Sequence, residues 1–275
     1  MTAAPAANDV ADDTANDGGR HRRLPDMGWA ARAGWLALIV YSAYAASLLD
    51  ITWDRFVIGL ANGAKFVGRM FPPDFARWQL LLQDLSESVE IAIIASAFGI
   101  ALSLPIGLLA ARNLMPDWVS WPARMVIAVC RSLHPVIVAI LFVKAVGFGA
   151  LAGTLALIVA SIGFVGKLFA EAIEEISLKQ VEAVRATGAP FFNVIAFAVL
   201  PQVLARFIGF STYQLDSNLR NSTMVGIVGA GGIGGTLFSA FQRFDYDFVC
   251  AILIAIIALI MVSEVISARL RATFQ

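Results

Sequence analysis

The stretch Glu182-Ala183-Val184-Arg185-Ala186-Thr187-Gly188 leads to Leu200-Pro201 and lies between two long apolar blocks of the chain. Its residue types favour helix, and it carries charges in a sequence that is otherwise strongly apolar. Charged side chains are rarely buried without partners, so this segment needs water or a soluble protein to contact. The stretch therefore predicts an exposed loop, within residues 171–201, in a membrane protein.

The composition supports a membrane protein. The chain of 275 residues is 59% hydrophobic and 15% charged, whereas soluble domains average about 45–50% apolar and about 25% charged residues. Its net charge is zero and no basic aromatic patch is present, so we expect membrane lipid and no nucleic acid as a partner. Cys130 and Cys250 lie in apolar blocks, which favours small buried side chains over a disulfide or a metal site.

The apolar residues fall into blocks long enough to cross the roughly 30 Å hydrocarbon layer as helices. We therefore expect an all-α membrane protein with six transmembrane helices. The predicted spans are 29–49, 84–111, 121–146, 148–169, 203–228 and 248–267.

The remaining segments complete the expected domain organisation. Residues 1–27 are predicted to be a disordered cytoplasmic tail, and 269–275 a short cytoplasmic tail. Residues 28–83 are expected to hold the first span and an amphipathic periplasmic loop, and 84–268 a helical core. The first span also resembles a signal peptide before Ala43-Tyr44-Ala45, although an uncleaved anchor is the preferred interpretation.

The distribution of Lys and Arg predicts the orientation. Roughly twice as many lie in segments on the side of the termini as on the other side. We expect an inner-membrane protein with both termini and the 171–201 loop in the cytoplasm. There, Glu171, Glu174 and Glu175 are interpreted as a solvated face.

Turn signals predict a rigid two-helix elbow in this loop. Ser177 and Gln180 have the spacing of a capping box, Gly188 suits the left-handed position after a helix, and Pro190 suits the first turn of the next helix. Pro201 is expected to end that second helix. The alternative is an ordinary connecting helix at the membrane surface.

Glu182 and Arg185 are three residues apart and are expected to share an exposed face of the first elbow helix. The whole segment resembles the coupling loop of ABC-importer permeases, with the pattern E-A-A, three residues, G, nine residues, I, one residue, L-P. Glu182, Ala183, Gly188, Leu200 and Pro201 match it, whereas Val184 and Ala198 depart from it.

Residues 84–268 are similar more specifically to permease subunits of phosphonate ABC importers, and permeases for phosphite or hypophosphite look similar. The resemblance implies a methionine-importer-type core with an added N-terminal helix. It also implies a second copy of the chain, two cytoplasmic ATPase subunits that bind ATP and Mg, and a periplasmic phosphonate-binding protein. No cofactor is expected in this chain. The matching pieces are Leu104-Pro105, Ala111-Arg112-Asn113, Arg131-Ser132, Lys144–Gly147, Gly166–Glu171, Leu200-Pro201-Gln202, Arg220–Thr223 and Gly226–Gly234.

Polar residues inside the predicted spans are candidates for a substrate path, because ionisable groups are costly in the bilayer. Guanidinium groups and hydroxyls suit the oxygens of a phosphonate. The alternative is a structural ion pair between Asp216 and Arg220, four residues apart. The candidate path residues are Arg131, Ser132, Arg220, Asn221, Ser222 and Thr223.

The glycine-rich end of the fifth span is interpreted as a gate where helices approach closely. Its candidate residues are Gly229, Gly231, Gly232 and Gly234. These glycines match the dinucleotide fingerprint G-x-G-x-x-G, but that motif requires a strand before it and a helix after it in a soluble unit.

Two other classes of membrane protein remain as alternatives. An intramembrane enzyme needs a catalytic cluster at one depth, and Asp216 has no obvious second aspartate. His134 is expected to be a buried, hydrogen-bonded imidazole. A secondary transporter would show internal repeats, and no convincing repeat is found. A related importer for another small solute, such as methionine, also remains open.

Overall fold

The computed structural model describes residues 28–49 and 52–274. The predicted disordered tail, residues 1–27, lies outside them. The chain forms two compact units, one up to Lys65 and one from Phe66 onward, and each is described by itself. The first unit holds α1 (Trp29–Leu48) and most of α2 (Trp53–Arg69), which continues into the second unit.

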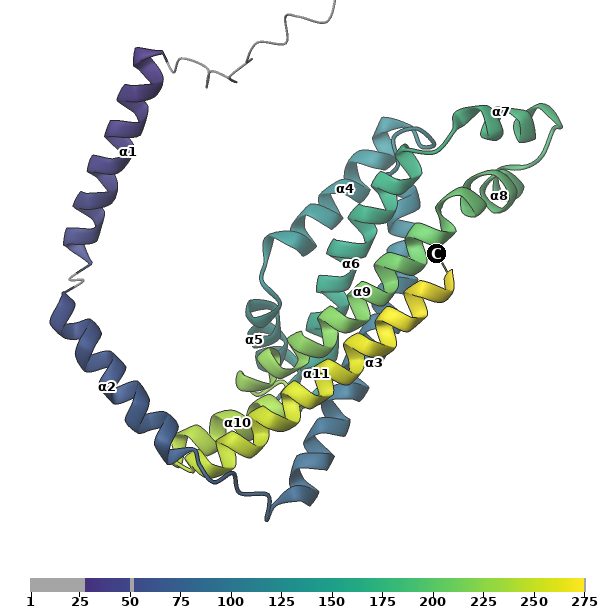
Figure 1. Ribbon diagram of the computed structural model, residues 1–275. Helices are drawn as coiled ribbons and strands as arrows, with labels where there is room; N and C mark the ends of the chain where they lie inside the picture. The colour runs from purple at the N-terminus through teal and green to yellow at the C-terminus, as the bar shows by residue number, and fades with distance from the viewer. Residues whose placement is uncertain (1–27, 50–51, 275) are drawn as a thin grey trace, which may run out of the picture. The chain divides into compact units, whose positions relative to one another are not determined.

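The second unit is an all-helical bundle (Figure 1). Four helical stretches in the described residues are long and apolar enough to cross a membrane, or up to six if two bent helix pairs each count as one span. The elements are α3 (Trp78–Ala110), α4 (Asp117–Ser132), α5 (Pro135–Val146), α6 (Ala150–Glu174), α7 (Leu178–Ala186), α8 (Phe191–Val194), the π-helix η1 (Ile195–Val199), α9 (Leu200–Ile227), α10 (Ile233–Gln242) and α11 (Tyr246–Phe274).

The predicted third span, 121–146, is bent rather than a single straight helix. It consists of α4 and α5, which meet at a 92° bend. Leu133 and His134 are extended, with ψ angles of 133° and 140°. His134 directly precedes Pro135, and the residue before a proline is disfavoured in the helical region. His134 is exposed rather than buried, and its Nδ1 accepts a hydrogen bond from the N–H of Val136 at 3.4 Å. The imidazole therefore caps α5.

Other predicted boundaries shift. The helix α3 begins six residues before the predicted start at residue 84, α6 continues to Glu174, and α11 runs through the predicted tail to Phe274. The helix α10, which follows the glycine-rich turn, was not predicted.

Pro201 does not end a helix, contrary to the prediction. It lies in the first turn of α9, and the path from Phe191 to Ile227 is continuously helical. Proline is tolerated in a first turn because its missing N–H is not needed there. The wider π-turns of η1 directly before it let the chain continue.

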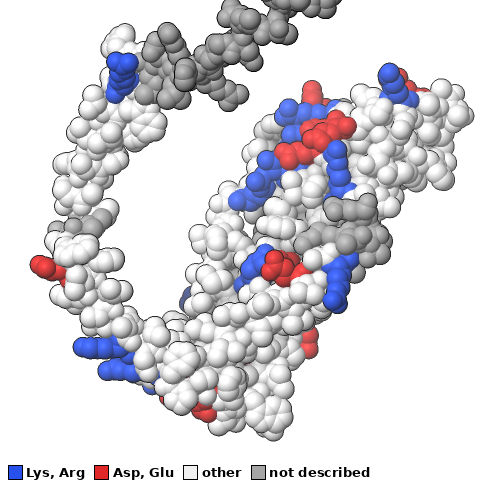
Figure 2. All heavy atoms as spheres, viewed as in Figure 1, with Lys and Arg blue, Asp and Glu red and all other residues white. Residues whose placement is uncertain are grey.

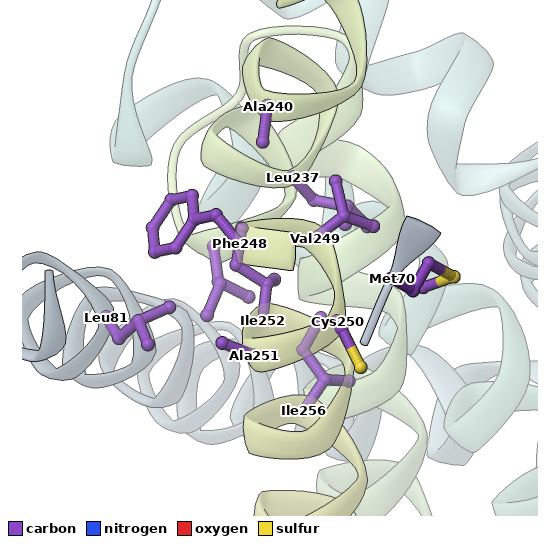
Figure 3. Close-up of a cluster of buried hydrophobic side chains, with 11 residues drawn as sticks. Met70, Leu81, Leu237, Ala240, Phe248, Val249, Cys250, Ala251, Ile252 and Ile256 are labelled. Carbon is purple, nitrogen blue, oxygen red and sulfur yellow. The ribbon is translucent and has the colours of Figure 1, made fainter. Parts of the chain in front are cut away.

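The end of the bundle opposite α7 and α8 has its own apolar core (Figure 3). Phe248, at 0% exposure, packs with side chains from α3, α10 and α11. The guanidinium of Arg77 lies 3.7 Å from the centre of the Phe248 ring and 3.3 Å from Asp245. These contacts fix the start of α3 to the turn between α10 and α11.

Candidate functional site

The segment from α7 to α8 folds as the predicted elbow. The helix α7 ends at Ala186, and Gly188 follows with a φ of +77°. Its N–H donates to the carbonyl of Arg185 at 3.0 Å. A left-handed conformation is costly for residues with a Cβ, so glycine allows the corner to be this tight. Pro190 lies one position earlier than predicted, as the N-cap of α8.

An apolar cluster holds the elbow against the bundle. Val181 of α7, Val194 of α8 and Val203 of α9 are each at most 2% exposed, and they pack with Phe169 and Ile173 of α6. The elbow is therefore anchored to the ends of α6 and α9 by a shared core, which allows these elements to move together.

The outer face of the elbow carries exposed charge. Glu182, Ala183, Arg185 and Gly188 are all exposed, as predicted. Phe192 is 80% exposed and its neighbour Phe191 is 41% exposed, so this face presents apolar as well as charged side chains. Phe192 was not among the predicted residues, although two adjacent phenylalanines, Phe191 and Phe192, directly after Pro190 were a usable signal.

The predicted capping box does not form. Ser177 is the N-cap of α7, but its side chain makes no capping hydrogen bond. Its N–H donates instead to the side chain of Gln202, at 3.0 Å. In a capping box the side chain of Gln180 would accept the N–H of Ser177. Here the side chain of Gln202, from α9, accepts it instead.

Of the three glutamates at the end of α6, Glu171 and Glu175 are exposed, as predicted, and Glu174 is half-buried. All three also pair with basic side chains. Glu171 lies 3.3 Å from Lys167, Glu174 bonds to Arg124, and Glu175 bonds to Arg206. Figure 2 shows positive and negative side chains gathered at this end of the bundle. The helix ends here are held together by charge as well as by apolar packing.

Two pockets meet at Arg131 in the last turn of α4. One has a volume of about 240 Å³ and the other, toward the elbow, about 570 Å³. Tyr213 and Phe164 stack with ring centres 5.5 Å apart beside the smaller pocket. The polar residues lining the smaller pocket are Arg131, Tyr213, Gln214, Ser217 and Asn221. Arg112, Arg124, Arg131, Ser132, Lys167 and Glu171 line the larger one.

The guanidinium of Arg131 is available to a ligand. Within residues 28–49 and 52–274 it makes no hydrogen bond or ion pair. Its aliphatic stem rests against Gly163 of α6, where an added Cβ would lie 2.8 Å from Cγ of Arg131. Ser132 is exposed and donates to the carbonyl of Val129 at 2.8 Å.

The other candidate path residues divide into two groups. Asn221 lines the smaller pocket with Arg131. Arg220 instead pairs with Asp216 at 2.7 Å, and Ser222 is buried and donates to the carbonyl of Leu219. Thr223 is half-buried and lines neither pocket. Of the six predicted residues, Arg131 therefore shares the smaller pocket with Asn221 and the larger pocket with Ser132.

Two further polar residues of α9 form a buried network rather than a path. Asn218, at 0% exposure, donates to Ser96 of α3 and Ser161 of α6, each at 2.9 Å. Gln214 donates to Ser161 and to Asn218, also at 2.9 Å. Buried polar groups need such partners, so this network ties three helices together where each passes through the core.

The glycine-rich segment is a tight turn between α9 and α10. Gly232 has a φ of +76°, and an added Cβ would lie 2.4 Å from the Oγ of Ser88 in α3. That hydroxyl accepts a hydrogen bond from the N–H of Ile233 at 2.9 Å. Gly229 and Gly231 lie in the same turn, and Gly234, in the first turn of α10, lies against the backbone of α9. A gating role for the four glycines stays a prediction.

No group of three or more His, Cys, Asp or Glu side chains that could hold a metal ion occurs in the part of the chain that the structure describes. Cys130 and Cys250 are free thiols.

Comparison with known proteins connects this architecture to transport. Residues 103–274 match the family of binding-protein-dependent transport system inner membrane components. The chain is 40% identical over 88% of its length to the phosphate-import permease protein PhnE of Mycolicibacterium smegmatis, and spans 46% of that protein. It is 38% identical to the phosphite transport system permease protein PtxC of Stutzerimonas stutzeri, covering 90% of this chain and 92% of the relative.

A solved structure has a similar fold. An inward-facing conformation of the MetNI methionine ABC transporter superposes on this chain with a TM-score of 0.65. It is 21% identical and covers 74% of this chain and 99% of the other. The all-α permease fold expected from the sequence is therefore confirmed.

Proposed function

Because this chain belongs to the family of binding-protein-dependent transport system inner membrane components, we propose that it is the permease subunit of an ATP-driven importer of phosphonates or phosphite. The observation that carries the proposal is the agreement between the family and relatives named for phosphate, phosphite and phosphonate transport. All three names concern tetrahedral phosphorus oxyanions, whose oxygens a guanidinium binds through charge-assisted hydrogen bonds.

The partners follow from this role. Two cytoplasmic ATPases bind ATP and Mg, and dock on the exposed face around Glu182, Arg185 and Phe192. A periplasmic binding protein delivers the anion to the opposite end of the bundle. A second copy of the chain completes the passage. This arrangement puts both termini in the cytoplasm, in agreement with the greater number of Lys and Arg on that side.

The substrate path runs along α4 and α9. Arg131 binds the anion with its planar fork of N–H donors, and Asn221 and Tyr213 line the smaller pocket beside it. An unpaired cation at membrane depth is costly, so an arriving oxyanion gains a strong partner there. The larger pocket, lined by three further cations, leads from Arg131 toward the elbow.

Transport proceeds by alternating access. Closure of the ATPase dimer on ATP moves the elbow and, through the shared apolar cluster, the ends of α6 and α9. Because α9 also lines the smaller pocket, this movement changes access to Arg131. ATP hydrolysis and release of the anion return the bundle to its other state.

Uptake measurements test the substrate class. Phosphorus-starved cells with and without this gene are given labelled methylphosphonate, with phosphite, phosphate or methionine as competitors. Gene-dependent uptake that excess phosphonate blocks supports the phosphonate assignment, and blockage mainly by phosphite assigns the importer to phosphite. Uptake that methionine alone blocks, or no gene-dependent uptake while an ATPase still copurifies, contradicts the proposed substrate class.

A further inference from the structure

Two side chains of α9 hold the corner between α6 and α7. Gln202 and Arg206 are four residues apart, so they lie on one face of the helix. Gln202 contacts Ser177, and Arg206 pairs with Glu175. Both contacts fall within the three residues 175–177, where the chain leaves α6 and enters the elbow.

The carboxamide of Gln202 is fixed at both ends. Its Oε1 accepts the N–H of Ser177 at 3.0 Å, and its Nε2 donates to the carbonyl of Ala198 at 2.6 Å. A backbone N–H can only donate and a carbonyl can only accept, so the two contacts determine which way the amide points. Glutamate at position 202 would keep the acceptor for the N–H of Ser177 but lose the donor to Ala198. Leucine at this position would lose both hydrogen bonds.

The second contact is an ion pair. Side chains of Arg206 and Glu175 are 53% and 64% exposed. Exposed pairs contribute little to stability, so this contact is better suited to set the angle of the corner than to hold the fold. The apolar cluster beneath the elbow supplies the stability.

These contacts give the elbow a second connection to α9. The covalent route from α7 to α9 passes through the left-handed Gly188 and the π-helix Ile195–Val199. A π-helical segment is a frequent site of bending, and Pro201 adds a residue with no N–H. Gln202 and Arg206 bypass this segment by joining the start of α7 directly to α9.

The same helix reaches the candidate substrate path. Beyond Arg206, α9 continues without a break to Ile227. It contributes Tyr213, Gln214, Ser217 and Asn221 to the pocket beside Arg131. A displacement of the corner at 175–177 therefore reaches the pocket lining through one continuous helix.

We propose that Gln202 and Arg206 form a brace that transmits movement of the elbow to α9 and so couples ATP hydrolysis to the opening of the path. The inference rests on the proposed function as a transporter, but not on the identity of the substrate. Both are positioning residues, because neither contacts the anion or the ATP.

Native Cys130 supplies a reporter that needs no substrate. It is half-buried and lines the pocket beside Arg131, whereas Cys250 is buried. The complex with its copurifying ATPase is treated with a methanethiosulfonate reagent, with and without ATP. In the unmodified protein we expect ATP to change the labelling rate of Cys130 by about fivefold or more. Fivefold is the lower end of the range of affinity changes that is typical of two allosterically coupled sites. Cys130→Ser measures the background.

The variants Gln202→Leu and Arg206→Glu are expected to retain the ATPase on purification and to reduce the ATP-dependent change in labelling to less than twofold. Glu175→Arg combined with Arg206→Glu should restore the change, because it re-forms the pair. Thr212→Val is the matched control on α9, since this threonine bonds only to carbonyls of its own helix.

In proteoliposomes with the ATPase, the binding protein and labelled methylphosphonate or phosphite, the brace variants should hydrolyse at least about fivefold more ATP per anion transported. The inference is overturned if ATP leaves Cys130 labelling unchanged in the unmodified protein. It is also overturned if the brace variants keep the normal labelling response and the normal ATP consumption per anion, or if they lose the ATPase on purification. The same holds if Glu175→Arg combined with Arg206→Glu does not restore the labelling response. A normal labelling response without phosphonate or phosphite uptake would instead contradict the proposed substrate alone.

Discussion

Asp216 Oδ2 lies 2.7 Å from Nη2 of Arg220, one turn further along α9. Oδ1 of Asp216 accepts a hydrogen bond from Ser263 of α11 at 3.1 Å. The carboxylate is 11% exposed and the guanidinium 42%. This pair therefore has a structural explanation that does not involve substrate.

Replacing Arg220 tests that explanation. Arg220→Ala leaves a buried carboxylate without its cation, so we expect a loss of about 1–2 kcal/mol in stability. This is less than for a fully buried pair, because solvent already screens Arg220. Thermal denaturation in detergent measures the loss, and Asp216→Asn with Arg220→Gln should recover most of it. If Arg220→Ala were fully stable yet inactive in uptake, Arg220 would belong to the substrate path.

Arg131 is the residue whose removal should affect transport most directly. Arg131→Ala is expected to lower anion uptake by about tenfold or more, since hydrogen bonds to charged groups contribute about 1.5–3 kcal/mol. Arg131→Lys should retain part of the uptake, because it keeps the charge but loses the planar fork. Lys144→Ala is the control, as this exposed cation lines neither pocket. Equal uptake by Arg131→Ala and Lys144→Ala would remove Arg131 from the path.

The corner at Gly188 gives a prediction about ATPase docking. Gly188→Ala forces a side chain into a φ of +77°, at a cost of about 1–2 kcal/mol, and should weaken copurification of the ATPase. Gly209→Ala is the matched control, because Gly209 lies within α9 with no neighbouring atom within 4 Å of an added Cβ. The docking role of the corner fails if both variants retain the ATPase equally.

The network around Asn218 should matter for stability rather than for uptake. Asn218→Ala removes three hydrogen bonds among buried groups, with an expected loss of about 1–2 kcal/mol in the membrane. Thermal denaturation of the detergent-solubilised protein measures the change. Ser211→Ala serves as the comparison, since this serine bonds only to the carbonyl of Phe207 in its own helix. A variant at Asn218 as stable as the Ser211 variant would contradict the structural role.

Local features of the elbow could be predicted because they depend on few residues. A glycine after a helix end and a proline before the next helix restrict φ and ψ by their own covalent structure. The corner at Gly188 formed where these residues indicated. The same rules misplaced Pro201, because they did not distinguish the end of a helix from a first turn that follows a π-helix.

The polar run in α9 shows what the sequence left open. Gln214, Asp216, Asn218, Arg220 and Asn221 lie within eight residues, but they point in different directions around one helix. Gln214 and Asn218 meet serines of α3 and α6, Asp216 meets α11, and Asn221 lines a pocket. Helical periodicity assigns relative faces only, so the neighbours of each face had to come from the packed structure.

The sequence by itself determined the apolar helices, the exposed elbow and the family, because hydrophobic length and local turn chemistry act within short segments. Tertiary structure decided that Arg220 has an ion-pair partner, whereas Arg131 has none among the described residues. It also decided that Gln202 bonds to Ser177, 25 residues earlier in the chain. Such contacts depend on how distant helices pack, and no local preference encodes them.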